Sequence, residues 1–197
     1  MRLMRTMVSS GETDHLVPER AWLEISRGLL EPHPELMFEV LERCGLRATL
    51  LPEIRQVSQR FSGPLPVRFA LLCWPLSESE VQALCDRLKV PNAERELAVL
   101  ESCLREKFSE IAKAAPAELL QMLKRADALR RPERFAQLLE AASLAQPGFD
   151  RSRLEKALHA ATAVDAGEVA RRASAPAEIP ALLDQERELA IAAALGG

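Results

Sequence analysis

The sequence has no tyrosine, and aromatic residues make up only 4% of its 197 positions. No apolar run approaches the roughly 20 residues that a membrane-spanning helix needs, and no membrane partner is expected. The start, MRLMRTMVSSGE, has too short an apolar segment for a signal peptide. The four cysteines lie far apart and form no CxxC pair: Cys44, Cys73, Cys85 and Cys103. Buried, reduced thiols and a cytoplasmic location are therefore expected.

The residues that would carry catalysis are also missing. There is no glycine-rich phosphate loop and no D-x-D pair of carboxylates. The three histidines, His15, His33 and His159, are far apart, and none lies beside a second ligand at metal-binding spacing. The sequence therefore predicts no catalytic, metal or cofactor site within this chain.

Most of the chain instead has the composition of helices. Hydrophobic residues make up 48% and charged residues 28% of the sequence, and many of the 13 prolines fall between periodic segments. No segment alternates with the period of a strand. We predict an all-α array of about ten helices. The formal net charge of −3 gives no global attraction to nucleic acid, so any RNA contact needs a local basic face.

Several helix ends and faces can be predicted individually. A helix tail is expected from Leu3 to Ser10, stopped by Gly11, so that the chain looks truncated at its start. In the stretch 18–30, the spacing predicts a buried face of Ala21, Trp22, Ile25 and Leu29. In the helix that Pro34 opens, the inward residues are expected to be Leu36, Met37, Val40 and Leu41, with Gly45 past its end. Ser77 with Glu80 fits a capping box, and Asp150 fits an N-cap.

Basic residues are the remaining candidates for a site. One cluster surrounds the predicted turn between two helices, and it comprises Lys124, Arg125, Arg130, Arg131 and Arg134. Smaller groups are Arg171 with Arg172, and Arg20 with Arg27. One interpretation is solvated helix ends, where cations also offset the helix dipole. The other is contact with phosphate, whose oxygens match the guanidinium fork.

Several stretches resemble a known family. SGETDHLVPERAWLEISRGLLEPHPELMFEVLERCGLRATLLPEI is similar to the region that follows the catalytic domain in bacterial CCA-adding tRNA nucleotidyltransferases and the related poly(A) polymerases. LCDRLKVPNAERELAVL, LLQMLKRADALRRPERFAQLLEA and AVDAGEVARR resemble later pieces of the same enzymes, in the same order. The resemblance covers nearly the whole chain except residues 55–66 and about 72–80.

The resemblance implies a neck-body-tail-like bundle that holds tRNA or another structured RNA. Residues 1–54 would be a neck-like RNA-binding region, 55–66 a linker, and 67–197 a body- and tail-like region. In this family a separate β-sheet head carries the catalytic carboxylates and the nucleotide-reading E-D-x-x-R motif. Neither has a counterpart in this chain.

Many relatives also carry a metal-dependent phosphohydrolase domain, marked by V-H-D-L-G-K-G after VRFA. In VRFALLCWPLSESEV, Trp74 and Pro75 fall where histidine and aspartate would be, and Ser77 replaces glycine. Neither an indole nor a proline nitrogen can ligate a divalent metal. The resemblance therefore implies a deleted phosphohydrolase motif, with its ends rejoined as helix, proline turn and capped helix.

Three functions remain open at this stage. The chain could be a tRNA-binding module without a catalytic centre. It could be one subunit of a split tRNA nucleotidyltransferase whose head is on another chain, docked on the apolar face of residues 21–29. It could also be a degenerate homologue that serves as an oligomeric interaction scaffold.

Overall fold

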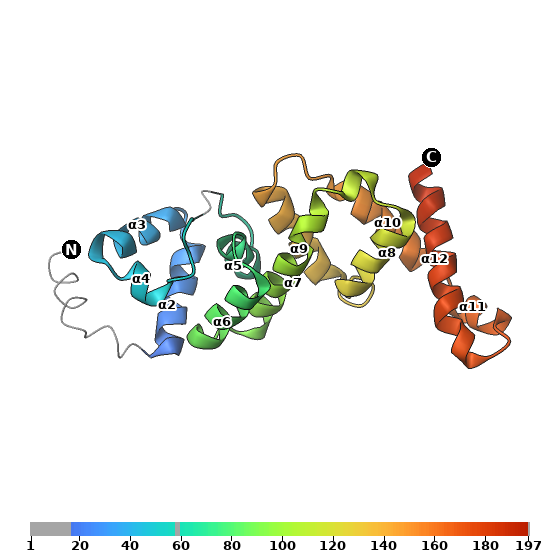
Figure 1. The fold of residues 1–197 in the computed structure, drawn as a ribbon, viewed down its shortest axis with the longest axis horizontal. Helices are drawn as coiled ribbons and strands as arrows, with labels where there is room; N and C mark the ends of the chain where they lie inside the picture. The colour runs from blue at the N-terminus through green and yellow to red at the C-terminus, as the bar shows by residue number, and fades with distance from the viewer. Residues whose placement is uncertain (1–16, 58–59, 197) are drawn as a thin grey trace. The chain divides into compact units, whose positions relative to one another are not determined.

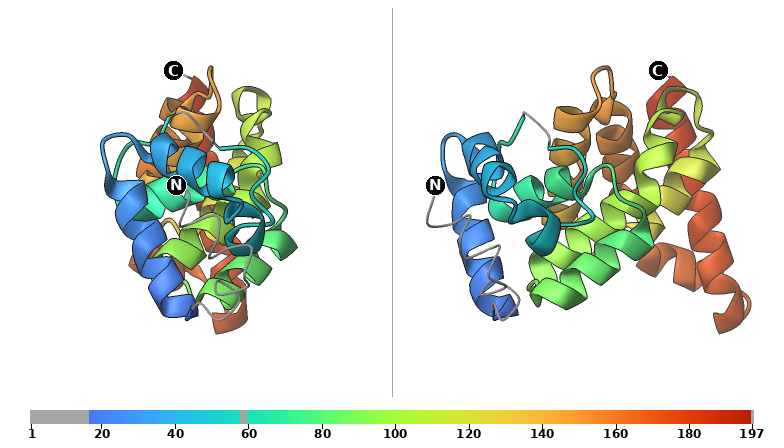
Figure 2. Two further views of the ribbon diagram at one scale, coloured as in Figure 1. Left: turned by 90° about the vertical axis from the view of Figure 1, so that its left-hand side faces the viewer. Right: turned by 60° about the vertical axis from the view of Figure 1, so that its left-hand side comes forward.

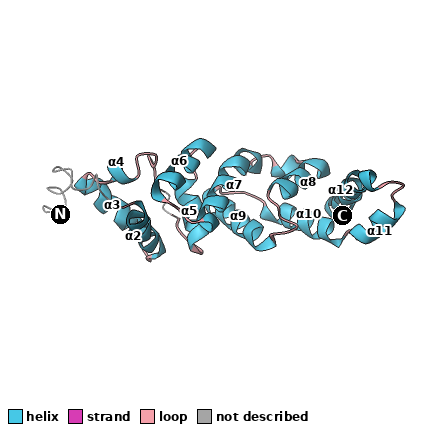
Figure 3. Cartoon of the chain, turned by 90° about the horizontal axis from the view of Figure 1, so that it is seen from below, coloured by secondary structure: helices cyan, strands magenta, loops and turns pink. Residues whose placement is uncertain are grey.

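The computed structural model describes residues 17–57 and 60–196, and every regular element in these ranges is helical (Figures 1 and 3). Eleven α-helices are present, and the described residues contain no strand. The prediction of an all-α array of about ten helices is confirmed. The helix tail expected from Leu3 to Ser10 lies outside the described residues.

The chain divides into two compact units. The first contains the described residues up to Cys103 together with Glu140–Pro147, and the second contains Leu104–Leu139 and the described residues from Gly148 onward. Within the first unit lie α2 (Pro18–Leu30), α3 (Pro34–Cys44), α4 (Arg47–Leu50), α5 (Leu65–Cys73) and α6 (Glu78–Leu88). Within the second lie η2 (Ile111–Lys113), α8 (Pro116–Arg125), α10 (Arg151–Ala163), α11 (Ala166–Arg172), η3 (Pro176–Glu178) and α12 (Ile179–Gly196). The two remaining helices, α7 (Asn92–Phe108) and α9 (Pro132–Ala145), contribute residues to both units.

The core of the first unit forms where α2 packs against α3, α5 and α6 (Figure 2). Trp22 meets Phe69 of α5 edge to face, with ring centroids 5.1 Å apart and planes at 87°, a favoured aromatic geometry. The face predicted for α2 (Ala21, Trp22, Ile25 and Leu29) is buried, as expected. The further expectation that this face would stay open for a partner is therefore wrong, because the chain's own core covers it.

The predicted face of α3 is wrong in part. Leu36 and Val40, expected to point inward, are 54% and 36% exposed. Phe38 is buried instead, and it stacks on Phe61 with ring centroids 6.1 Å apart. Phe61 lies in a segment without helical periodicity. The pattern of apolar residues in α3 alone therefore could not predict that Phe38 would be the buried side chain.

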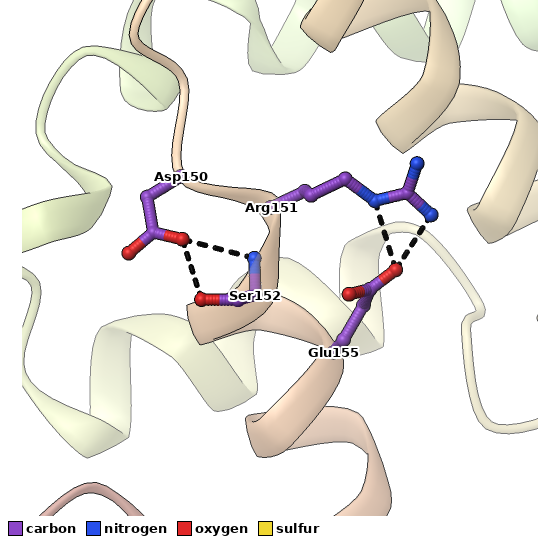
Figure 4. Close-up of polar contacts among 4 residues, drawn as sticks. All are labelled: Asp150, Arg151, Ser152 and Glu155. Atoms are coloured by element: carbon purple, nitrogen blue, oxygen red, sulfur yellow. Dashed lines mark hydrogen bonds and ion pairs between the residues drawn. The ribbon is translucent and has the colours of Figure 1, made fainter.

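The predicted helix ends are confirmed. The Ser77 N–H donates to Glu80 Oε2 at 2.8 Å, and the Glu80 N–H donates to Ser77 Oγ at 3.4 Å, which completes a capping box. Asp150 accepts the Ser152 N–H at 3.0 Å and the Ser152 hydroxyl at 2.6 Å at the start of α10 (Figure 4). The hydrogen bond from the Ser152 hydroxyl is the main reason why the pKa of Asp150 is lowered. Gly45 ends α3 with φ of 82°.

In the second unit α12 packs against α8, α10, α11 and η3. On α10 the buried side chains are Leu154, Ala157, Ala160 and Ala161. Such small side chains let helix axes approach closely. No described helix is both long and apolar enough to cross a bilayer.

Candidate nucleic-acid interface

The turn between α8 and α9 brings five of the predicted cations together. We call these residues the basic turn: Lys124, Arg125, Arg130, Arg131 and Arg134. Asp127 takes a left-handed conformation with φ of 51°, which aspartate tolerates better than most residues. Its carbonyl accepts the N–H groups of Arg130 at 3.1 Å and Arg131 at 2.9 Å. One aspartate therefore fixes the backbone of the turn that presents these arginines.

Two members of the basic turn are held by partners within the second unit. Arg134 Nη2 donates to the carbonyl of Ala126, just past the end of α8, at 2.8 Å. Lys124 Nζ lies 2.5 Å from Asp184 Oδ2 on α12. Helix carbonyls at a C-terminus lack intrahelical partners, so Arg134 stabilises the end of α8. These two side chains have structural roles that phosphate binding would have to displace.

The other three members are more accessible to a ligand. Arg130 and Arg131 face the half-exposed Asp127 carboxylate at 4.0 and 3.7 Å, and Arg130 is 85% exposed. Ion pairs of this kind contribute about 0–1 kcal/mol, so a phosphate can compete for the guanidinium groups. Arg125, the last residue of α8, is exposed and forms no ion pair with another described residue. Arg125, Arg130 and Arg131 are therefore the strongest phosphate-binding candidates in the turn.

Arg171 and Arg172 form a separate group in the last turn of α11. Arg171 pairs with Glu168 of the same helix at 3.4 Å, and Arg172 pairs with Glu186 of α12 at 2.7 Å. Lys124 reaches Asp184 of α12, two residues away from Glu186. Residues two apart on a helix point about 200° apart. The two basic groups thus bind different sides of α12.

The remaining predicted pair lies in the first unit. Arg20 and Arg27 are seven residues apart on α2, so they project from the same side of the helix two turns apart. Both are exposed, and Arg27 Nη1 lies 3.1 Å from Glu24 Oε1. This exposed pair leaves the Arg27 guanidinium accessible to a competing phosphate.

Sequence reasoning missed a second group of arginines in the first unit. Arg43, Arg47 and Arg55 line an open hollow of about 570 Å³ together with three glutamates of α3, Glu35, Glu39 and Glu42. Arg43 pairs with Glu39 at 3.2 Å, while Arg47 binds both Glu42 and the Ile54 carbonyl. The four-residue spacing of Glu39 and Arg43 was the available signal. The glutamates make this hollow mixed in charge.

Arg68 was not predicted to have any role, yet its guanidinium binds three backbone carbonyls of the first unit. Its Nη1 donates to the carbonyl of Leu29 at 2.7 Å and of Glu31 at 3.0 Å, and its Nε donates to the Gly63 carbonyl at 2.9 Å. One guanidinium therefore ties the end of α2 to the start of α5.

Other arginines bind backbone carbonyls in the same manner. Arg87 of α6 donates to the Leu50 carbonyl at the end of α4 at 2.7 Å, and it pairs with Glu53 at 2.6 Å. In the second unit, Arg153 of α10 donates to the Ala114 carbonyl at 2.9 Å. A substantial share of the chain's positive charge is thus engaged in holding helices together.

The stretch 73–77 has the structure that the sequence predicts. Trp74 follows the end of α5, Pro75 is exposed, and the Leu76 N–H donates to the Cys73 carbonyl at 2.8 Å. α6 then begins behind the Ser77 cap. Across the described residues, no three histidine, cysteine, aspartate or glutamate side chains gather where a metal could be held.

Three of the four thiols are shielded. Burial, with smaller contributions from neighbouring charges, raises the pKa of Cys73 well above its usual value, and burial raises the pKa of Cys85 to about 11. Cys44 is also buried, whereas Cys103 is half-exposed with its Sγ donating to Glu78 Oε2 at 2.9 Å. All four are free thiols.

We therefore expect one thiol per chain to react rapidly with an aromatic disulfide reagent at neutral pH, and four after unfolding in urea. The absorbance of the released thiolate measures this. Cys103→Ser should abolish the rapid phase. Two or more rapidly reacting thiols in the folded protein would contradict the burial described here.

Comparison with known proteins shows which family the chain resembles. A family model described as "Probable RNA and SrmB- binding site of polymerase A" matches residues 1–57. The Multifunctional CCA protein of Paraburkholderia phytofirmans is 38% identical over 249 aligned residues, which cover 99% of this chain and 61% of that protein. The Multifunctional CCA proteins of Cupriavidus taiwanensis and Cupriavidus necator are 37% and 36% identical to it. Both alignments include all of this chain, and they include 60% and 61% of the respective relative.

Over nearly its whole length, the chain is similar to proteins of the CCA-adding and poly(A) polymerase family. It corresponds to a C-terminal part of that family's proteins, as the sequence predicted, and it spans about 60% of the length of the curated relatives. No solved structure matches it. Within the described residues, the family's RNA-binding match comprises α2, α3, α4 and the segment up to Val57. It therefore includes Arg20 and Arg27.

Proposed function

We propose that this chain binds tRNA, or a similarly structured RNA, through phosphate contacts and without base-specific recognition. The observation that carries the proposal is the match of the family's RNA-binding model to residues 1–57. The exposed guanidinium groups supply the chemistry: Arg20 and Arg27 in the first unit, and Arg125, Arg130 and Arg131 in the second. Structured RNA is recognised mainly by shape and by its backbone, which suits dispersed cations.

The domain organisation follows the same proposal. Residues 1–54 would be the neck-like RNA-binding region, 55–66 a linker, and 67–197 the body- and tail-like region. This division is one of ancestry, and it differs from the two compact units, whose boundaries along the chain fall after Cys103, Leu139 and Pro147. A cytoplasmic location, where tRNA is processed, belongs to the proposal as well.

Salt dependence of tRNA binding tests the proposal. With labelled tRNA and the purified chain, we expect binding at low salt that weakens linearly on a log–log plot as salt rises. The slope should be about −0.7 to −0.9 for each phosphate contacted. Phosphate contacts by all five of these arginines would give a slope of roughly −4. No binding at low salt, or binding with no slope, would remove the proposal.

The length of the alignment supports the deletion of a domain. Since the chain has 197 residues, an alignment of 249 positions leaves at least 52 without a counterpart in this chain. We propose that these include the phosphohydrolase segment that the resemblance places after VRFA. The capped α6 and the uninterrupted buried face of Val81, Leu84, Cys85 and Leu88 are what a cleanly rejoined chain would need.

A second proposed function is that of one subunit of a split nucleotidyltransferase whose head is another polypeptide. One observation favours it: α2 and α3 expose large apolar side chains, namely Leu23, Leu30, Leu36 and Val40. A contiguous patch of such side chains would mark an interaction surface. This alternative predicts that CCA addition requires both polypeptides. The oligomeric scaffold instead predicts that the chain self-associates through the same side chains.

A further inference from the structure

A hollow of about 350 Å³ opens beside the stretch 73–77, and all of its lining belongs to the first unit. Trp74 lines it after the end of α5, together with Gln56 and Arg60 from the segment before α5. Apolar side chains, Leu71 and Leu144 among them, complete the lining. Its volume lies within the roughly 300–1,000 Å³ typical of small-molecule sites.

The charge of this hollow distinguishes it from three others in the described chain. No carboxylate lines it, and its single charged residue is Arg60. Each of the other three carries at least one glutamate: Glu35, Glu39 and Glu42 in one, Glu110 and Glu118 in the second, and Glu188 in the third. In a chain with 29 acidic and 26 basic residues, a hollow with only positive charge is suited to an anion.

The lining of this hollow also contains an aromatic side chain. The chain has two tryptophans and no tyrosine. Trp22 is buried in the core, whereas Trp74 is half-exposed and lines the hollow. Proteins hold unpaired bases by stacking them on aromatic side chains, and they hold the attached phosphate with a cation. A flat indole, an amide and a guanidinium in one apolar hollow are the side chains that this mode of binding uses.

We propose that this hollow binds one unpaired nucleotide, with the base stacked on Trp74, its edge hydrogen-bonded by Gln56 and its phosphate bound by Arg60. The inference rests on the proposed RNA-binding function, and it names the part of the RNA that this hollow takes: an unpaired residue and not a duplex. The base would lie between the indole and the apolar lining, which includes Leu71 and Leu144.

Tryptophan fluorescence tests the site directly, because no tyrosine contributes and Trp22 is buried. A short single-stranded RNA should quench the emission of Trp74, and a blunt RNA duplex should not. Trp74→Leu, which keeps apolar bulk, should abolish the quench and weaken binding of the labelled strand roughly tenfold. Trp74→Phe should restore part of the affinity. Arg60→Gln should weaken binding severalfold and leave the circular dichroism spectrum unchanged.

A matched control lies five residues away. Arg55 is exposed and lines a different hollow, so Arg55→Gln should leave the quench of Trp74 intact. Quenching by adenosine monophosphate alone would also support the site, with a free nucleotide as its ligand. Equal quenching by duplex, or unchanged affinity of Trp74→Leu and Arg60→Gln, would overturn the inference while tRNA binding stands. If the wild-type chain binds neither tRNA nor the single strand, the proposed function itself fails.

Discussion

Replacing Arg68 with alanine is expected to lower the free energy of unfolding of the first unit by about 3 kcal/mol. Arg68 donates hydrogen bonds to the carbonyls of Leu29, Glu31 and Gly63 at 2.7–3.0 Å. Removal of the side chain leaves the partly buried carbonyls of Leu29 and Gly63 without this hydrogen-bond donor. A hydrogen bond to a charged group contributes about 1.5–3 kcal/mol to the free energy of unfolding. The three bonds share one side chain, so their contributions do not add fully.

Urea unfolding followed by tryptophan fluorescence measures this change selectively. Both tryptophans, Trp22 and Trp74, belong to the first unit, so the transition reports that unit. Arg68→Lys keeps the charge but loses the fork of donors, and it should recover only part of the stability. Arg27→Ala is the matched control: its exposed pair with Glu24 should contribute less than 1 kcal/mol. Equal effects of the Arg68 and Arg27 variants would show that Arg68 does not hold α2 and α5 together.

Local signals in the sequence predicted the helix ends well. The Ser77–Glu80 capping box, the Asp150 cap and the Gly45 stop are all present. Each depends on groups no more than four residues apart along the chain. Such contacts form whenever the helix forms, so the tertiary structure does not change them.

Contacts between distant segments were not predictable in the same way. α3 turned toward Phe61, which left Leu36 and Val40 exposed against expectation. The partner of Lys124 lies 60 residues away, and Arg68 reaches carbonyls up to 39 residues away. An arginine in a sequence looks the same whether it will bind phosphate, a glutamate or a carbonyl. Only the fold selects among these partners.

The arginines of this chain therefore fall into two kinds with separable effects. Arg68, Arg87 and Arg134 donate to backbone carbonyls at helix ends. Their loss should lower stability without changing how RNA binding depends on salt. The exposed arginines of the basic turn should behave in the opposite way, because surface pairs contribute little to folding while each phosphate contact releases counterions.

The triple variant Arg125→Gln, Arg130→Gln and Arg131→Gln is expected to bind tRNA 10–100-fold more weakly at low salt, and to reduce the magnitude of the salt slope by about 2–3. Its free energy of unfolding should change by less than 1 kcal/mol, since Asp127 sets the turn through its backbone carbonyl and the side-chain pairs are exposed. Labelled-tRNA titrations across a salt series, with urea unfolding in parallel, measure both quantities.

Two controls define what the triple variant reports. Arg151 lies in the second unit but outside the basic turn, and its Nε and Nη2 bind Glu155 at 2.9 and 2.6 Å (Figure 4). Arg151→Gln should leave the slope unchanged. Arg134→Gln should lower stability while the slope stays the same.

A triple variant with the wild-type slope would exclude the basic turn as the RNA-binding surface. If the chain still binds RNA through the cations described above, the double variant Arg20→Gln and Arg27→Gln should then reduce the salt slope. These two exposed arginines lie within the RNA-binding match.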